Sequence, residues 1–229
     1  MRALILGSGP DLRPWSLTDL PTSPITEWHR GNLIAAGIRD LRLVQSDFPA
    51  NRLGMMVEAS TWLEGDDCLI LEGDHAFSPS LLRAVAAGTE EIEVAYQPSH
   101  GARLPNEPGH PERASLKITC YPDGTLQSVL PTRTRGHRET GYCLGLWRMT
   151  PRGWRKITEL LASLSAAERH RLDVGGLLGR LAREGMQIRM IPVPGGWRVL
   201  GNPEQVLLED PRPLRRGLAM DSPSNRLAA

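Results

Sequence analysis

The sequence predicts an α/β domain with a doubly wound, mostly parallel sheet and a small antiparallel hairpin insertion. Short runs rich in leucine or β-branched residues alternate with helical patterns along most of the chain, which is typical of βαβ units. The first apolar run ends at the turn-forming Gly7-Ser8-Gly9. Asp123-Gly124 separates two later apolar runs and is a strong hairpin signal.

The strands and helices follow from these patterns in chain order. The strands expected are residues 3–6, 41–44, 68–71, 92–96, 116–121, 125–130, 142–148 and 188–193. The helices expected are residues 27–36, 55–62, 79–87, 151–161 and 174–184. Ser78-Pro79 and Thr150-Pro151 place a capping side chain before a proline at the first helical position. Gly37 and Gly185 follow the ends of two helices.

A long loop and a tail are expected where apolar periodicity is absent. Residues 97–113 are rich in Pro, Gly, His and Arg. This composition favours either a mobile loop near a bound ligand or an insertion without a ligand role. After Asp210 the chain becomes rich in Pro, Arg and Ser. We therefore predict one domain over residues 1–210 and a flexible tail over residues 211–229.

Charge and cysteine content exclude several classes of function. The 27 basic and 26 acidic residues leave a formal net charge of +1, which argues against nucleic acid or a membrane surface as the main partner. No apolar run approaches membrane-spanning length. The three cysteines are widely spaced in apolar runs, as buried free thiols of a reducing compartment are. We therefore expect a soluble cytoplasmic protein.

Three motifs near strand ends admit both a functional and a purely structural interpretation. The glycines at residues 7–9 would let backbone amides approach a phosphate, although a tight turn alone also explains them. Asp74 follows a strand at the edge where open α/β sheets bind ligands, so it is a candidate ligand for Mg²⁺ or simply a capping residue. His75 is interpreted as a turn residue packed on the sheet edge. Glu139 is either an acceptor contact or a solvated loop carboxylate.

Four segments of the sequence carry a resemblance to a known family. Residues 6–14 read LGSGPDLRP and residues 68–77 read CLILEGDHAF. Residues 139–142 read ETGY and residues 196–206 read GWRVLGNPEQV. In this order and spacing, over about residues 1 to 208, the chain resembles the sugar-phosphate and alcohol-phosphate nucleotidyltransferases, and looks most similar to the inositol-phosphate cytidylyltransferases.

This resemblance implies a Rossmann-like fold of the nucleotidyltransferase type and a set of site residues. The nucleotide would be bound by Leu6, Gly7, Ser8 and Gly9, and the acceptor by Glu139, Thr140 and Gly141. Asp74 would bind Mg²⁺ and act in catalysis with Arg13, which would supply positive charge. The implied partners are a nucleoside triphosphate, CTP above all, and a small phosphorylated alcohol or sugar. A homodimer is a further expectation.

Three positions depart from the family pattern. Asp11 stands where the family has Arg, Thr22-Ser23 where it has Lys, and Gly201 where it has a second metal-binding Asp. Loss of these contacts should weaken triphosphate binding and leave Mg²⁺ weakly held. Two hypotheses stay open: a cytidylyltransferase-like enzyme, and a catalytically inactive protein that binds a nucleotide or phosphate ligand. A third hypothesis is a structural dimer module that uses the tail.

Overall fold

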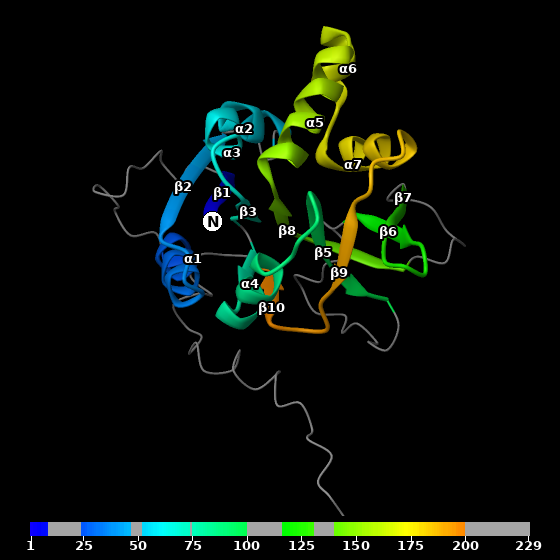
Figure 1. The fold of residues 1–229 in the computed structure, drawn as a ribbon. Coiled ribbons are helices and arrows are strands. Elements are labelled where there is room, and N and C mark those ends of the chain that lie inside the picture. The colour runs from blue at the N-terminus through cyan, green and yellow to red at the C-terminus, as the bar shows by residue number, and fades with distance from the viewer. Residues whose placement is uncertain (9–23, 47–51, 74, 100–115, 131–139, 200–229) are drawn as a thin grey trace, which may run out of the picture.

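The computed structural model describes residues 1–8, 24–46, 52–73, 75–99, 116–130 and 140–199 (Figure 1). The central sheet runs in the order β2-β1-β3-β8-β5-β9. These strands are β1 (Arg2–Ser8), β2 (Asp40–Ser46), β3 (Cys68–Glu72), β5 (Ile92–Pro98), β8 (Gly141–Met149) and β9 (Arg189–Pro192). Their pairings are parallel except those of β8, which runs antiparallel to both β3 and β5.

The predicted hairpin is present beside this sheet. Strands β6 (Lys117–Cys120) and β7 (Leu126–Leu130) pair antiparallel with each other. Strand β6 also pairs antiparallel with the beginning of β8, which attaches the hairpin to the sheet. Gly124 in the turn has a φ of 83°, a left-handed conformation that favours glycine, so the Asp123-Gly124 signal predicted this turn correctly.

Alternate side chains of β1 enter two separate hydrophobic cores. Leu4 and Leu6 belong to the core formed with α2 (Arg52–Glu58), α3 (Ser60–Leu63), α5 (Pro151–Ser163) and α7 (Val174–Arg183). Ala3 and Ile5 belong to the core formed with α1 (Pro24–Ala35) and α4 (Pro79–Ala86). Because successive side chains of a strand point to opposite faces, helices cover both faces of the sheet (Figure 1). This confirms the predicted doubly wound α/β class.

Two predicted segments have different boundaries in the structure. The helix expected over residues 55–62 is interrupted at Ala59, whose φ of −88° and ψ of 15° separate α2 from α3. Gln97 and Pro98, expected to begin the long loop, instead extend β5, because they pair with Tyr142 and Gly141 of β8. The rest of that predicted loop, from residue 100 to residue 113, lies outside the described residues, as does the predicted domain boundary at residue 210.

Three short elements escaped sequence prediction. Strands β4 (His75–Phe77) and β10 (Trp197–Val199) pair antiparallel, and three residues are too few to show a period. Helix α6 (Ala166–Arg171) buries none of its residues, so it has no apolar period either. The available signal was the spacing of Ser165 and Glu168, which form a capping box at its start. No helix in the described ranges is long and apolar enough to cross a membrane.

A buried ion network ties three strands together at the amino ends of β3 and β5. Arg148 of β8 is 5% exposed. Its guanidinium lies 2.5 Å from a carboxylate oxygen of Asp67, which precedes β3, and 3.4 Å from one of Glu93 on β5. It also donates a hydrogen bond to the Glu90 carbonyl. A buried charge whose partner is removed is costly, so this network should matter for stability.

We expect Arg148→Met to lower the free energy of unfolding by about 3 to 5 kcal/mol, because Glu93 would be left as a buried charge without this cation. The measurement is equilibrium unfolding in urea. Arg152→Met is the matched control: Arg152 also pairs with a carboxylate, that of Glu91, but its side chain is 74% exposed. The control should lose no more than about 1 kcal/mol. Equal losses in the two variants would contradict this account of the network.

Candidate active site

The carboxyl ends of β1 and β3 meet at one point of the sheet edge. The amide of Gly73 donates a hydrogen bond of 2.8 Å to the carbonyl of Leu6. A Cβ on Gly73 would lie 3.0 Å from that carbonyl oxygen and 3.3 Å from the Cα of Gly7. Only glycine fits here without displacement of the first strand. Leu6 and Gly7, two of the predicted nucleotide-binding residues, therefore lie directly beside Gly73, the residue that precedes Asp74.

Helix α1 fixes the same junction from one side of the sheet. Nε2 of His29, which is 2% exposed, lies 3.1 Å from the carbonyl oxygen of Gly73 and is hydrogen-bonded to it. One turn further along the helix, the side-chain amide of Asn32 donates to the carbonyl of Phe77 at the end of β4. The chain between β3 and α4 is thus held at two backbone carbonyls by side chains of one helix.

The antiparallel direction of β8 brings its beginning to the same edge. Because Cys68 pairs with Met149 and Leu71 with Leu146, β8 starts near the carboxyl end of β3. Two predicted acceptor-binding residues, Thr140 and Gly141, lie there. The Thr140 hydroxyl accepts a hydrogen bond from the Cys120 amide. A Cβ on Gly141 would overlap the Gln97 carbonyl. Both residues hold neighbouring strands, and contact with an acceptor stays a prediction.

Strand β8 contains a bulge that makes room for a carboxylate. Val94 of β5 pairs with Trp147, but Tyr96, two residues on, pairs with Cys143. Within the extra residues of β8, Gly145 has a φ of 66°. A Cβ on Gly145 would lie 2.5 Å from the carboxyl carbon of Glu72. A side chain at position 145 would therefore be strained and would also collide with Glu72.

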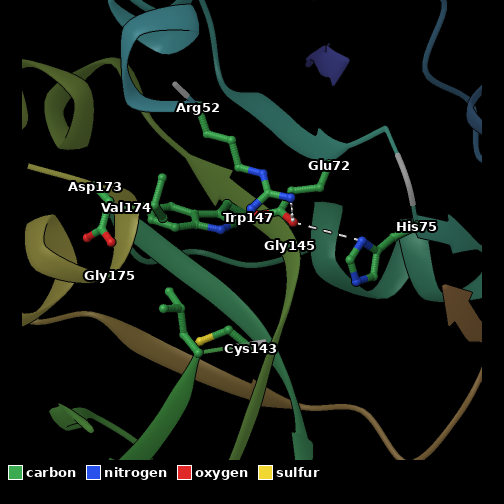
Figure 2. Close-up of a pocket in the computed structure, with 10 residues that line it drawn as sticks. Arg52, Glu72, His75, Cys143, Gly145, Trp147, Asp173, Val174 and Gly175 are labelled. Atoms are coloured by element: carbon green, nitrogen blue, oxygen red, sulfur yellow. Dashed lines mark ion pairs between the residues drawn. The ribbon is translucent and has the colours of Figure 1, made fainter. Parts of the chain in front are cut away.

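Glu72 faces a cavity of about 240 Å³ (Figure 2). Its carboxylate lies 3.0 Å from the guanidinium of Arg52 and 3.9 Å from Nδ1 of His75. The bulged strand β8 contributes Cys143, Gly145 and Trp147 to the cavity lining. The beginning of α7 contributes Asp173, Val174 and Gly175, and Leu116 precedes the hairpin. The cavity thus has an apolar wall of strand residues and charged groups at its ends.

His75 is not the turn residue that the sequence suggested. It lies in β4 and is 3% exposed. Its imidazole stacks on Phe77 with ring centroids 6.1 Å apart, and the indole of Trp197 lies 6.4 Å away at a tilt. The correction follows from the pairing of β4 with β10, which the sequence did not reveal. Figure 2 shows this ring at one end of the cavity, beside Glu72.

The three cysteines are free thiols, as predicted. Burial raises the pKa of Cys120 to about 11 and that of Cys68 to about 12. Burial, and next the nearby Glu72 carboxylate, raises the pKa of Cys143 well above its usual range. Cys143 lines the cavity, yet at neutral pH it is a protonated thiol and not a nucleophile. Cys143 therefore contributes a neutral thiol to the cavity wall.

The predicted magnesium ligand lies in a part of the chain that the structure does not describe. Among them, no group of three or more His, Cys, Asp and Glu side chains is placed to hold a metal ion. Glu72 is the carboxylate that the end of β3 brings to the edge, and Arg52 already pairs with it. The predicted ligand Asp74 and the residues Gly9, Arg13 and Glu139 lie outside the described part of the chain. Their predicted roles stay predictions.

Sequence reasoning missed three charged residues that line the cavity, Arg52, Glu72 and Asp173, and assigned the fourth titratable residue, His75, to a turn. Glu72 and His75 stand next to the predicted Gly73-Asp74 motif, so their position after β3 was a usable signal. Asp173 precedes α7 as an N-cap, and a capping residue is normally interpreted as structural only. No sequence signal brings Arg52 to this edge, because its place depends on how α2 packs.

We expect Gly145→Ala to lower the free energy of unfolding by about 2 to 4 kcal/mol, through the positive φ and the collision with Glu72. Gly31→Ala is the control, because a Cβ there meets no atom within 4 Å and alanine favours an exposed helix. Urea unfolding measures both. Adding Glu72→Ala to Gly145→Ala should recover part of the loss. If Gly145→Ala and Gly31→Ala lost the same free energy of unfolding, or if Glu72→Ala recovered none of the loss, the bulge would not serve to make room for the Glu72 side chain.

We expect His29→Phe to loosen the Gly73 junction, because phenylalanine fills the same space without a hydrogen bond to the Gly73 carbonyl. Hydrogen exchange, followed by NMR or mass spectrometry, should become faster in the segment from Gly73 to Ala76. In Asn32→Leu the change should centre on Phe77 instead. Faster exchange throughout α1 in both variants would mean that His29 supports the helix and not the junction.

Comparison with solved structures places this geometry among known folds. The inositol-1-phosphate CTP transferase from T. maritima matches with a TM-score of 0.62 and 16% sequence identity, covering 96% of this chain and 98% of that chain. No family model matches the sequence, and neither does any curated protein. At this identity the likeness concerns the fold, and the chain has the fold of a nucleotidyltransferase.

Proposed function

We propose that this protein transfers a cytidylyl group from CTP to the phosphate of a small polyol or alcohol and releases pyrophosphate. One observation carries the proposal: the joined ends of β1 and β3 lie at the same sheet edge as the cavity lined by Glu72 and β8. In doubly wound sheets, ligands bind outside the carboxyl ends of the strands. A nucleotide site and an acceptor site would therefore be neighbours here.

The nucleotide would lie over the end of β1. The predicted binding residues are Leu6, Gly7, Ser8 and Gly9, whose backbone would approach the phosphates where no side chain blocks them. The tight contact between Gly7 and Gly73 supports this proposal, because it fixes the backbone of the first strand against the third. Arg13 would supply positive charge in place of the arginine that Asp11 replaces.

Asp74 would hold Mg²⁺, since a carboxylate oxygen is a ligand that this ion prefers and Gly73, the residue before it in the sequence, lies beside β1. When bound, Mg²⁺ supplies neutralisation of the triphosphate charge. The ion would be weakly held, because Gly201 stands where a second Asp is expected. The chain's own contribution at this point is rigidity: His29 and Leu6 both hold the backbone of Gly73.

The acceptor would occupy the cavity, with its phosphate toward the nucleotide. The volume of the cavity, about 240 Å³, suits a small polyol phosphate. Glu139, Thr140 and Gly141 would contact the acceptor from the beginning of β8. A phosphate oxygen of the acceptor would attack the α-phosphorus of CTP in line. The bond from the α-phosphorus to the bridging oxygen would break, and pyrophosphate would leave. No protein nucleophile is needed.

We expect CTP with Mg²⁺ to raise the melting temperature by about 5 °C or more when the nucleotide is well above its Kd. Asp74→Asn should remove most of this shift because it removes the carboxylate ligand. Asp66→Asn, at the opposite end of β3, is the control and should keep it. If no nucleoside triphosphate stabilises the wild type, the proposed transfer is wrong.

Turnover is expected to be slow, because Asp11, Thr22-Ser23 and Gly201 remove charge that would stabilise the transition state. Turnover is measured as the release of pyrophosphate from CTP in the presence of polyol phosphates. Asp11→Arg combined with Gly201→Asp should raise either nucleotide affinity or turnover. A wild-type rate in the ordinary enzyme range, about 1 to 1000 per second, would contradict the expected weakness.

A further inference from the structure

The two ends of the cavity differ in charge. At the end next to the Gly73 junction, the Glu72 carboxylate is 3.0 Å from the Arg52 guanidinium, so the two charges offset each other. At the other end stands Asp173, beside Val174 and Gly175 (Figure 2). Asp173 forms none of the ion pairs identified in the described part of the chain. Among the described residues that line the cavity, the far end is therefore the more negative one.

Asp173 is fixed in this position by helix α7. Its side chain caps the helix, with one carboxylate oxygen accepting a hydrogen bond of 2.6 Å from the Gly176 amide. A helix N-terminus favours negative charge, and at the N-terminus of α7 the Asp173 carboxylate already supplies it. The first turn packs closely on Leu116, because a Cβ on Gly175 would lie 2.7 Å from a methyl group of that side chain.

We propose that Asp173 determines acceptor specificity: it receives hydroxyl groups of a polyol monophosphate that has no acidic group besides its phosphate, and rejects acceptors with a second acidic group. The orientation rests on the proposed function, which puts the acceptor phosphate at the junction end. A hydroxyl group donates well to a carboxylate, whereas a second anion beside Asp173 is repelled. Trp147 and Val174 offer apolar surface between the ends for the carbon skeleton.

Glycerol 3-phosphate and 3-phosphoglycerate form a matched pair of probes, because a terminal hydroxymethyl group in the first is a carboxylate in the second. Calorimetric titration at pH 7.5, with and without CTP and Mg²⁺, gives both affinities. We expect the wild type to bind glycerol 3-phosphate at least about tenfold more tightly than 3-phosphoglycerate. The larger ligand myo-inositol 1-phosphate, which also has no acidic group besides its phosphate, should behave like glycerol 3-phosphate.

Asp173→Asn removes the charge and keeps a side-chain oxygen that can cap α7, so the fold should survive. In this variant the preference for glycerol 3-phosphate should fall by about three- to tenfold. Glu168→Gln is the control: Glu168 is an exposed carboxylate at the start of α6 that does not line the cavity, and glutamine can keep its capping box. This variant should retain the wild-type preference.

The inference is overturned if the wild type binds both probes equally, if Asp173→Asn keeps the full preference, or if neither glycerol 3-phosphate nor myo-inositol 1-phosphate binds. Its failure is distinct from that of the proposed function. Binding of CTP without the charge preference would remove the role of Asp173 and leave nucleotidyl transfer in place. The charge preference without CTP binding would support the role of Asp173 in a protein that binds polyol phosphates and transfers no nucleotide.

Discussion

The hydrogen bond from the Gly73 amide to the Leu6 carbonyl sets the geometry on which the candidate site depends. It forms because two parallel strands end side by side and because glycine leaves no Cβ between them. His29 then holds the other polar group of the same residue, its carbonyl. Both backbone polar groups of Gly73 are therefore held, the amide by the first strand and the carbonyl by helix α1.

The second constraint is the reversed direction of β8 between β3 and β5. A parallel strand would have brought its carboxyl end to this edge, whereas β8 brings its beginning and, shortly afterwards, a bulge. The left-handed Gly145 in that bulge accommodates the Glu72 side chain, which in turn holds Arg52. The cavity and the edge where β1 and β3 end thus share one carboxylate, that of Glu72.

Much of the fold was predictable because it rests on local patterns. The alternation of apolar runs and helices gave the α/β class, and Asp123-Gly124 gave the hairpin. The meeting of Gly7 with Gly73 was predictable in outline, since neighbouring parallel strands end at one edge. The cavity was not predictable from the sequence, because the bulge at Gly145 arises from how β8 pairs with β3 on one side and with β5 on the other. Asp173 was missed because a helix cap has the same sequence pattern whether or not a cavity lies beside it.

The central claim is that a nucleotide binds where β1 and β3 end, and amide NMR during a CTP titration with Mg²⁺ tests it most directly. The account predicts that the largest shift changes occur at Gly7, Ser8 and Gly73. Amides around Asp67 and Glu93, at the amino ends of β3 and β5, should change little. Largest changes at that second group, with Gly7 and Gly73 unaffected, would contradict the account.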